Sequence, residues 1–418
     1  SASGCASTSG SGRRGPEAGR HRGRGQSRPV TVSSARRERR GFYDSLVTAS
    51  PQTPTVVIMA AGEGTRMRSS LPKVLHPVCG RPMIAWSVRA AQQAGAGRVV
   101  VVVAPNRDLS PGLPEGAETV VQPRPDGTGG ALRAAIDVVR TSPELVVLSG
   151  DHPLITAEQI QQLLATHREQ RAAATLMTVE MEEPGSYGRV VRDDDGAVDR
   201  IVETKHPESV PPEILAIREV NTGTYCFSGP ELADALSRLS DDNPAGEYLL
   251  PDVLPILRAG GGRVAAHKAS DAAVNLGVNT RADLALAAAE ARRRILREHM
   301  LAGVTIVDPE STWIEADVEI EPDVVIEPGT YLRGATRIAR GAVIGPHSTL
   351  IDSRVGADAR VVHSYLVECE VGARCNVGPF AYLRPGATLA DGAKAGTFVE
   401  IKNSQVGEGA KVPHLSYV

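Results

Sequence analysis

The chain has 418 residues, of which 41% are hydrophobic and 3% aromatic, and this length and composition predict a globular protein with two domains. Its longest purely aliphatic run covers only residues 99–104, whereas about 20 apolar residues are needed to span a bilayer, so the sequence excludes a transmembrane segment. The formal net charge is −3, but residues 1–53 hold ten Arg and three acids, so the rest carries 36 bases against 46 acids, which argues against nucleic acid as the main partner.

Residues 1–53 form a leader rich in Gly, Ser and Arg, with little apolar material around which a fold could form. We therefore predict that the leader is disordered. An Arg-rich leader poor in acids is compatible with a transit peptide, whereas the lack of an initiating Met is compatible with a fragment or a misjudged start. No secretory apolar segment follows it, so we expect that the protein is not secreted.

The sequence contains five cysteines, Cys5, Cys79, Cys226, Cys369 and Cys375. Their number is odd, and their spacing matches neither a zinc site nor a disulfide framework. We therefore expect a reducing, cytoplasmic location.

Residues 54–281 alternate short β-branched runs with Ala-rich amphipathic segments, which predicts βα units on a mostly parallel sheet. The clearest strands are the runs TVVIMA, RVVVVVA and ELVVLSG, each apolar throughout, as expected when helices cover both faces of the sheet. A loop that contains Gly or Pro follows each run, and ligands of such folds bind at these carboxyl ends. We therefore expect an α/β, Rossmann-like domain with its chemistry on these loops.

Residues 282–303 connect this domain to the rest of the chain. The run from Ala282 to Met300 predicts one helix with a basic polar face, which we interpret as a spacer.

Residues 304–418 form a second domain in which aliphatic residues recur at every sixth position, with shorter steps near Val361. This period predicts hexapeptide repeats, in which three short edges make one triangular coil and the inward side chains stack from coil to coil. Gly residues follow many of the inward aliphatic residues. We expect Gly345, Gly356, Gly372, Gly378 and Gly407 to turn the corners of the coils.

A Gly-rich turn, MAAGEGTRM, covers Met59–Met67 and directly follows the first predicted strand. Its backbone could approach a phosphate and offer N–H donors. Alone the motif is a weak signal, because structural Gly-rich turns after strands are common. It lacks the Lys of a P-loop, and Met67 stands where the dinucleotide fingerprint needs its third Gly. The turn therefore indicates a nucleotide-binding loop of another class.

Two cations follow this turn closely, Arg66 within the turn and Lys73 in LPKVL. Their charge would offset the negative charge that builds on the α-phosphate and on the departing pyrophosphate of a nucleoside triphosphate. For Arg66 the alternative is a solvated surface cation.

Asp151 in SGDHPL lies just past a predicted strand, at the edge of the sheet where ligands bind. A carboxylate together with one amide, such as Asn279 in GVNTR, suits Mg²⁺, which prefers few protein ligands beside phosphate oxygens and waters. The alternative for Asp151 is a helix cap. Thr156 and Gln159 already match the capping pattern of the next helix, which weakens that alternative.

These motifs resemble those of the bifunctional bacterial N-acetylglucosamine-1-phosphate uridyltransferase and glucosamine-1-phosphate acetyltransferase family, called GlmU. The resemblance spans residues 56–418 and rests on the order and spacing of AAGEGTRM, LPKVLHPVCGRPM, QPRPDGTGGA, GDHPL, GSYGRVV, IVETK, EVNTG, GEYLLPDV and GVNTR. It implies that the first domain transfers UMP from UTP to N-acetylglucosamine 1-phosphate and releases pyrophosphate.

The resemblance also implies roles for individual residues. UTP and the product nucleotide would be held by Met59, Ala60, Ala61, Gly62, Gln122, Gly127, Thr128 and Ser149, and the amino sugar by Gly188, Glu203 and Asn221. Lys73 and Arg66 would act on the phosphates, and Asp151 and Asn279 would hold Mg²⁺. The sequence departs from the family at Gly130, where His is usual, and at Leu249, Leu250 and Pro251, which alter an aromatic run. Neither departure removes a predicted ligand.

The repeat domain resembles the left-handed parallel β-helix of hexapeptide acyltransferases, whose handedness breaks the usual crossover rule. In the GlmU family this domain forms a trimer and acetylates glucosamine 1-phosphate with acetyl-CoA. The matching residues are Arg384 and Lys402 for the sugar phosphate, His414 as general base, and Tyr417 beside it. The chain ends before the coils that contact acetyl-CoA in the family. We therefore expect an incomplete acetyltransferase site and a fragment of a longer protein.

Two alternative interpretations stay open. The chain could make another nucleotide sugar, with a repeat domain used only for assembly or regulation, or it could be a non-catalytic scaffold that has kept the fold. A scaffold would be expected to lose its charged ligands, whereas Lys73, Asp151 and Asn279 are all present.

Overall fold

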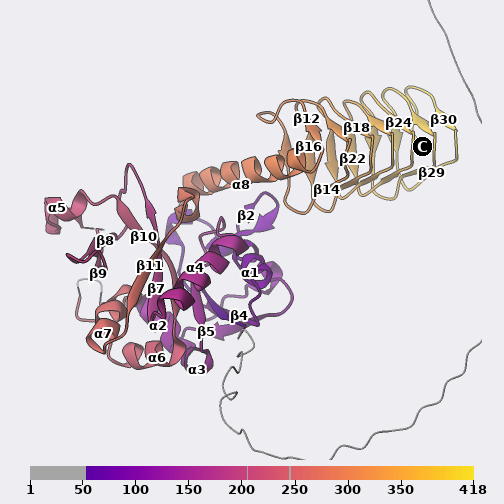
Figure 1. Cartoon of the computed structure of the whole chain (residues 1–418). Coiled ribbons are helices and arrows are strands. Elements are labelled where there is room, and N and C mark those ends of the chain that lie inside the picture. The colour runs from indigo at the N-terminus through magenta and orange to yellow at the C-terminus, as the bar shows by residue number, and fades with distance from the viewer. Residues whose placement is uncertain (1–52, 205, 244–245) are drawn as a thin grey trace, which may run out of the picture. The chain divides into compact units, whose positions relative to one another are not determined.

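The computed structural model describes residues 53–204, 206–243 and 246–418 (Figure 1). The prediction of a disordered leader therefore falls almost entirely outside the described residues, as does Cys5.

Within the described residues, the first domain is built on a nine-stranded, mostly parallel sheet. From one edge to the other its strands are β11 (Val264–Lys268), β7 (Ala174–Glu180), β10 (Glu219–Phe227), β6 (Leu145–Ser149), β1 (Thr55–Met59), β4 (Arg98–Val103) and β5 (Ala117–Val121), with the hairpin of β8 (Arg189–Arg192) and β9 (Val198–Val202) beside β10. Among the seven strands from β11 to β5, only β10 runs antiparallel to its neighbours, and the hairpin of β8 and β9 adds further antiparallel pairs. The predicted Rossmann-like α/β fold is confirmed.

Helices bury both faces of this sheet, because alternate side chains of each strand point to opposite sides. In β1, Val57 packs into a cluster with residues of α2 (Gly127–Ala134), α3 (Ile136–Thr141), α6 (Gly229–Ser237) and α7 (Val253–Ala259). Its neighbours Val56 and Ile58 pack against α1 (Met83–Gln93) and α4 (Ala157–Gln170) on the other face. This two-sided burial explains why the predicted strands are apolar throughout. The predicted capping box of Thr156 and Gln159 is present at the start of α4.

The helix α8 (Arg281–Leu301) follows the sheet domain, one residue longer at each end than the predicted segment. We expected only a spacer, but the helix packs against both flanking regions of the chain. Its buried residues Ala287 and Ile295 belong to one hydrophobic cluster with Met83 of the first domain and Ile314 of the repeat domain. Apolar burial thus fixes the helix against residues on both sides of it in the sequence.

The repeat domain is a left-handed parallel β-helix made of three sheets, as predicted. The first sheet contains β12 (Thr305–Ile306), β15 (Val325–Ile326), β18 (Val343–Ile344), β21 (Arg360–Val361), β24 (Asn376–Val377), β27 (Lys394–Ala395) and β30 (Lys411–Val412). The second contains β13 (Trp313–Ile314), β16 (Tyr331–Arg333), β19 (Thr349–Ile351), β22 (Tyr365–Val367), β25 (Tyr382–Leu383) and β28 (Glu400–Ile401). The third contains β14 (Glu319–Ile320), β17 (Arg337–Ile338), β20 (Arg354–Val355), β23 (Glu370–Val371), β26 (Thr388–Leu389) and β29 (Gln405–Val406). Further short elements among the described residues include β2 (Pro77–Val78), β3 (Arg81–Pro82) and α5 (Pro212–Leu215), beside several 3-10 helices.

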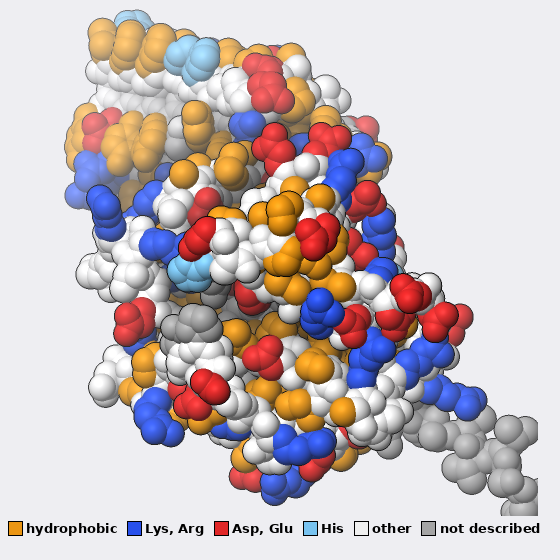
Figure 2. All heavy atoms as spheres, turned by 90° about the vertical axis from the view of Figure 1, so that its left-hand side faces the viewer, with side chains coloured by type: hydrophobic (Ala, Val, Ile, Leu, Met, Phe, Trp, Pro, Cys, Tyr) orange, Lys and Arg blue, Asp and Glu red, His pale blue; other side chains and the backbone are white. Residues whose placement is uncertain are grey.

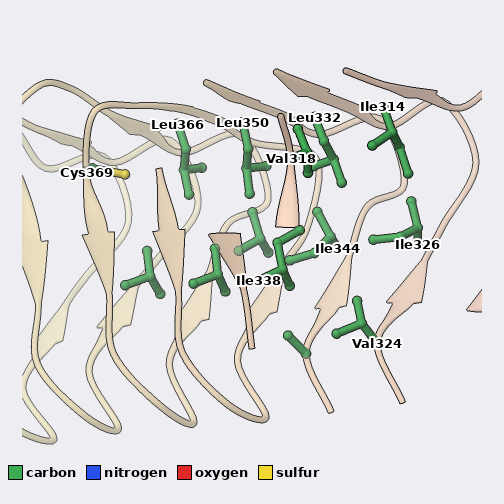
Figure 3. Close-up of a cluster of buried hydrophobic side chains, with 14 of the residues drawn as sticks. Ile314, Val318, Val324, Ile326, Leu332, Ile338, Ile344, Leu350, Leu366 and Cys369 are labelled. Atoms are coloured by element: carbon green, nitrogen blue, oxygen red, sulfur yellow. The ribbon is translucent and has the colours of Figure 1, made fainter. Parts of the chain in front are cut away.

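The inward aliphatic side chains stack in columns, as Figure 3 shows for Ile314, Leu332, Leu350 and Leu366. All four are fully buried. Leu332 pairs with Leu350, 18 residues on, where the six-residue period holds, whereas Leu350 pairs with Leu366, 16 residues on, across the shorter steps. The short steps therefore tighten single coils without breaking the column.

The expectation for the corner glycines is only partly right. Gly345 and Gly378 have positive φ values of 106° and 98°, but Gly356, Gly372 and Gly407 do not adopt a positive φ. Many left-handed corner positions hold other residues, such as Asp352 and Phe380. A Cβ on Gly356 would lie 2.6 Å from the backbone nitrogen of Ala373 in the next coil. Gly is needed there because neighbouring coils approach closely, and not because the chain turns.

No helix within the described residues is both long and apolar enough to cross a membrane. The four described cysteines, Cys79, Cys226, Cys369 and Cys375, are free and buried. On the face shown in Figure 2, basic side chains are interspersed with acidic ones, which agrees with the mixed charge of the sequence.

Candidate functional site

A cavity of about 550 Å³ lies at the carboxyl ends of β1 and β6, where the fold predicts the ligand. Ten residues expected to contact the nucleotide or its metal line it, namely Met59, Ala60, Ala61, Gly62, Lys73, Gln122, Gly127, Thr128, Ser149 and Asp151. The sequence analysis did not single out five further lining residues, Glu63, Val74, Pro125, Ala131 and Glu247. All five lie within the motifs AAGEGTRM, LPKVLHPVCGRPM, QPRPDGTGGA and GEYLLPDV, which is the signal that pointed to their parts of the chain.

The Gly-rich turn is held next to Lys73 by close packing. Gly64 has a φ of 65°, and a Cβ there would lie 2.6 Å from the Cβ of Lys73. The backbone nitrogen of Gly150 donates to the carbonyl oxygen of Met59 at 2.9 Å, which joins the loop after β6 to the loop after β1. The turn thus brings Lys73 and Asp151 to the same edge of the sheet.

Two cations share the oxygen atoms that were predicted to hold a metal. Lys73 Nζ lies 2.5 Å from Asp151 Oδ2 and 3.2 Å from Asn279 Oδ1. Arg66 Nη2 donates to the same Asn279 Oδ1 at 2.9 Å. The structure therefore brings all four predicted residues together, although they come from three separate segments of the chain.

Backbone hydrogen bonds hold the two oxygen-bearing residues in place. The nitrogen of Val278 donates to the carbonyl oxygen of Asp151 at 2.9 Å. The nitrogen of Asn279 donates to Asp283 Oδ2 at 3.0 Å, and Asp283 also completes the capping box of α8 with Thr280. The start of α8 thus positions Asn279 beside the loop of Asp151.

Asp151 carries a negative charge in this environment. Burial alone would raise the pKa of its carboxyl group, but the hydrogen bond from His152 and the charges of His152 and Lys73 outweigh burial and hold the pKa well below its usual range. His152 Nδ1 lies 2.9 Å from Asp151 Oδ1, so Oδ2 is the oxygen that faces Lys73. The sequence analysis did not assign a role to His152.

The oxygen atoms of Asp151 and Asn279 fit Mg²⁺. One carboxylate and one amide oxygen are the hard ligands that this ion prefers when phosphates and waters complete its shell. In the structure the ammonium group of Lys73 contacts both oxygens, so the pair already attracts a cation. Among the described residues, no group of three or more His, Cys, Asp or Glu side chains could hold a metal ion, so the shell would depend on substrate oxygens and water.

The three residues predicted for the amino sugar also lie together. The nitrogen of Asn221 donates to the carbonyl oxygen of Gly188 at 2.9 Å. A Cβ on Gly188 would lie 2.8 Å from Ile201 and 3.4 Å from Glu203 Oε1, so a larger residue would disturb this corner. Gly223 lies two residues after Asn221, and a Cβ on Gly223 would lie 3.5 Å from Oγ of Ser149, which lines the cavity. The three residues therefore lie close to the cavity.

The altered aromatic run at residues 249–251 contacts Thr128, which lines the cavity. The nitrogen of Leu250 donates to Thr128 Oγ1 at 2.9 Å, and the side chain of Leu250 is buried in the core. The nitrogen of Gly129 donates to the carbonyl oxygen of Tyr248 at 2.7 Å. These bonds tie the start of α2 to the loop, whichever side chains stand at Leu249 and Pro251.

The predicted acetyltransferase residues lie on successive coils near the end of the repeat domain. Arg384 and Lys402 follow the paired strands β25 and β28, and the nitrogen of Arg384 donates to the carbonyl oxygen of Ile401 at 2.9 Å. Arg384 Nη1 also donates to Glu400 Oε1 at 2.9 Å. His414 is exposed, and Tyr417 forms a β-bridge with Glu400. Arg384, Lys402 and Tyr417 therefore lie on the second sheet or directly after its strands, whereas His414 follows β30 of the first sheet.

A family model and two related proteins agree with this picture. Residues 56–251 match the family model of the MobA-like NTP transferase domain. The chain is 46% identical over 363 residues to the bifunctional protein GlmU of Desulfitobacterium hafniense, which covers 87% of this chain and 79% of that protein. It is 47% identical over 380 residues to the bifunctional protein GlmU of Kineococcus radiotolerans, covering 89% and 76%. A solved UDP-glucose pyrophosphorylase in complex with UDP-glucose aligns with 58% of this chain and 99% of its own, at 17% identity and a TM-score of 0.46.

Proposed function

Because the chain belongs to the family of bifunctional GlmU proteins and is a sugar-1-phosphate nucleotidyltransferase, we propose that it transfers UMP from UTP to N-acetylglucosamine 1-phosphate with Mg²⁺. The products are UDP-N-acetylglucosamine and pyrophosphate.

The observation that supports this proposal most directly is the group of Lys73, Arg66, Asp151 and Asn279 at one edge of the cavity. Mg²⁺ held by Asp151 and Asn279 would supply charge neutralisation at the phosphates. With those two oxygens engaged, Lys73 and Arg66 become free to pair with phosphate oxygens and to stabilise the charge on the departing pyrophosphate.

No general base is required of the chain. The attacking group is a sugar phosphate, which is already ionised at pH 7, so orientation and charge neutralisation suffice. Gln122, Gly127 and Thr128 are proposed to orient the uridine. The hydroxyl oxygen of Thr128 accepts from Leu250, which leaves the hydroxyl hydrogen available to the ligand. Gly188, Glu203 and Asn221 are proposed to contact the amino sugar.

A pyrophosphate-release assay across pairs of nucleotides and sugar phosphates tests the proposal. We expect the highest kcat/KM with UTP and N-acetylglucosamine 1-phosphate, and no turnover after chelation of divalent metal. A higher kcat/KM with another nucleotide or with glucose 1-phosphate would support the alternative nucleotide-sugar enzyme. No turnover with any pair would support the scaffold.

The second proposal concerns the repeat domain, which is proposed to be an incomplete acetyl-CoA:glucosamine-1-phosphate acetyltransferase domain. For this chain we propose binding of glucosamine 1-phosphate and little or no acetyl transfer from acetyl-CoA. Arg384 and Lys402 are proposed to hold the sugar phosphate, with His414 as general base and Tyr417 beside it. Calorimetry with glucosamine 1-phosphate tests the phosphate contacts. We expect Arg384→Ala and Lys402→Ala to weaken binding, whereas Arg374→Ala, which removes an exposed pair with Asp391, leaves it unchanged. Equal affinity in all variants would refute this assignment.

We also propose that the repeat domain assembles as a homotrimer. Four half-exposed or partly buried rings form a column on successive coils, with centroid distances of 5.0 Å from His347 to His363, 4.9 Å from His363 to Phe380 and 5.1 Å from Phe380 to Phe398. Phe398 is 58% exposed, and a row of exposed rings favours burial against another surface. Sedimentation should give a trimer for the protein and a smaller species for Phe398→Asp. A monomeric wild type would refute the proposal.

We propose a cytoplasmic location for the protein. The four free, buried cysteines are consistent with a reducing compartment.

A further inference from the structure

We propose that Asp126 is a positioning residue that fixes the amide of Gln122, so that the cavity selects a pyrimidine with an N3–H donor, uracil rather than cytosine. This inference rests on the proposed function, because it takes Gln122 to face the base of the nucleotide.

The orientation of the Gln122 amide follows from its partners. Gln122 is 4% exposed and lines the cavity. Its Nε2 lies 2.8 Å from Asp126 Oδ1 and 3.1 Å from the carbonyl oxygen of Gly127. Both partners only accept hydrogen bonds, so the amide nitrogen must point toward them and the amide oxygen away from them. No donor within the described residues reaches Oε1, which leaves that oxygen to accept a bond from a ligand.

Gly130 provides the space that the Asp126 carboxylate occupies. A Cβ on Gly130 would lie 1.9 Å from Asp126 Oδ1 and 2.4 Å from its Cγ. Any other residue at this position of α2 would displace the carboxylate from Gln122. The departure of Gly130 from the family pattern therefore has a structural counterpart, the side chain of Asp126.

The backbone of Asp126 is itself held on both sides. Its nitrogen donates to the carbonyl oxygen of Arg124 at 2.9 Å, and its carbonyl oxygen accepts from the nitrogen of Tyr248 at 2.9 Å. Since Gln122 and Asp126 belong to one short loop that is anchored in this way, the carboxylate restrains the amide and does not merely follow it.

This geometry distinguishes the two pyrimidines by their hydrogen-bonding edges. Uracil presents an N3–H donor, which suits Gln122 Oε1. Cytosine presents an acceptor at N3, so the same oxygen would face another acceptor, and an unmatched buried polar pair is a strong basis for rejection. When Asp126 is lost, one of the two acceptors that hold Nε2 is lost, and the amide can rotate to offer Nε2 to cytosine. Thymine also carries N3–H and is not rejected by this device.

The test compares kcat/KM for UTP and CTP, with N-acetylglucosamine 1-phosphate as the second substrate. We expect the UTP-to-CTP ratio to fall about tenfold or more in Asp126→Leu and in Gly130→Ala, since each variant removes one charge-assisted hydrogen bond from Gln122. Gly130→Ala acts through the flexible end of a side chain and lies inside a helix that accepts Ala, so it tests the inference even if Asp126→Leu does not fold.

Two controls separate positioning from general stability. Asp126→Asn keeps an acceptor oxygen for Gln122 and should retain the wild-type ratio. Asp137→Leu removes an exposed acid from the first turn of α3 and should also leave the ratio unchanged. UTP methylated at N3 adds a second measure. Its kcat/KM should be far below that of UTP in the wild type, and the difference between the two kcat/KM values should be smaller in Asp126→Leu.

The outcomes also separate this inference from the proposed function. If the wild type does not prefer UTP to CTP, the proposed function fails. If the wild type prefers UTP but folded Asp126→Leu and Gly130→Ala keep the full ratio, Asp126 does not position Gln122 and this inference alone is overturned.

Discussion

Replacing Lys73 by Met should have two opposite effects, on metal binding and on turnover. In the structure, Lys73 Nζ occupies a position between Asp151 Oδ2 and Asn279 Oδ1, at 2.5 and 3.2 Å, and its side chain is only 12% exposed. These are the oxygens proposed to bind Mg²⁺. In the absence of nucleotide, a metal ion must therefore displace the ammonium group before it can bind.

The size of the first effect follows from the contact that is broken. A hydrogen bond to a charged group contributes about 1.5–3 kcal/mol, and about 1.4 kcal/mol corresponds to a tenfold change in affinity. We therefore expect Lys73→Met to tighten metal binding by the nucleotide-free protein about 10- to 100-fold. With both substrates present, turnover should fall about 100-fold or more, because the phosphates lose one preorganised cation.

The metal affinity can be measured with Mn²⁺ by electron paramagnetic resonance of the free ion, and turnover by pyrophosphate release. Lys268→Met is the matched control, since it removes an exposed Lys of β11 that pairs with Glu180 of β7. It should change neither quantity. Unchanged or weaker Mn²⁺ binding by folded Lys73→Met would refute the idea that Lys73 takes the place of the metal. Unchanged turnover would show that Lys73 has no role in catalysis.

Three further predictions concern single features of the structure. Asp151→Ala should abolish nucleotidyl transfer while the thermal midpoint stays within a few degrees of wild type, and near wild-type turnover at saturating Mg²⁺ would remove Asp151 from the site. Burial raises the pKa of Cys79 to about 12 and of Cys369 to about 11, so both thiols should stay protonated and resist iodoacetamide at pH 8 until the protein unfolds, which mass spectrometry of a Cys5→Ala protein can check. Leu350→Ala should lower the free energy of unfolding by about 2–5 kcal/mol, because it opens a cavity in a column that is fully buried, and a loss below about 1 kcal/mol in denaturant titration would contradict this packing.

Several local features were predictable because their causes lie within a few residues. The strands β1, β4 and β6 are apolar throughout since helices cover both faces, and the capping box of Thr156 and Gln159 needs only four consecutive residues. The six-residue period of the repeat domain likewise predicts its columns of buried side chains. The family resemblance then pointed to Lys73 and Asp151 before any contact between them was known.

Other features depend on packing between distant segments, and no local pattern encodes them. Gly356 was expected to turn a corner, but it is needed because the next coil passes close to it. The helix α8 was expected to be a spacer, but it shares a buried cluster with both flanking regions.

By itself the sequence predicted the α/β domain, the repeat domain, the apolar strands and the cap of α4, and it indicated the charged residues of the candidate site, because strand patterning, capping and the spacing of motifs are read along the chain. The left-handedness of the β-helix followed from the family resemblance. Only the tertiary structure decided that Lys73 contacts the side-chain oxygens of Asp151 and Asn279 and that Arg66 contacts that of Asn279. It also decided that the Asp126 side chain fills the space left by Gly130. Lys73 and Asn279 are 206 residues apart in the sequence. The need for Gly at position 130 becomes visible only once the position of the Asp126 side chain is known. Such contacts follow from how the sheet, its loops and the start of α8 pack together, which is a property of the whole domain.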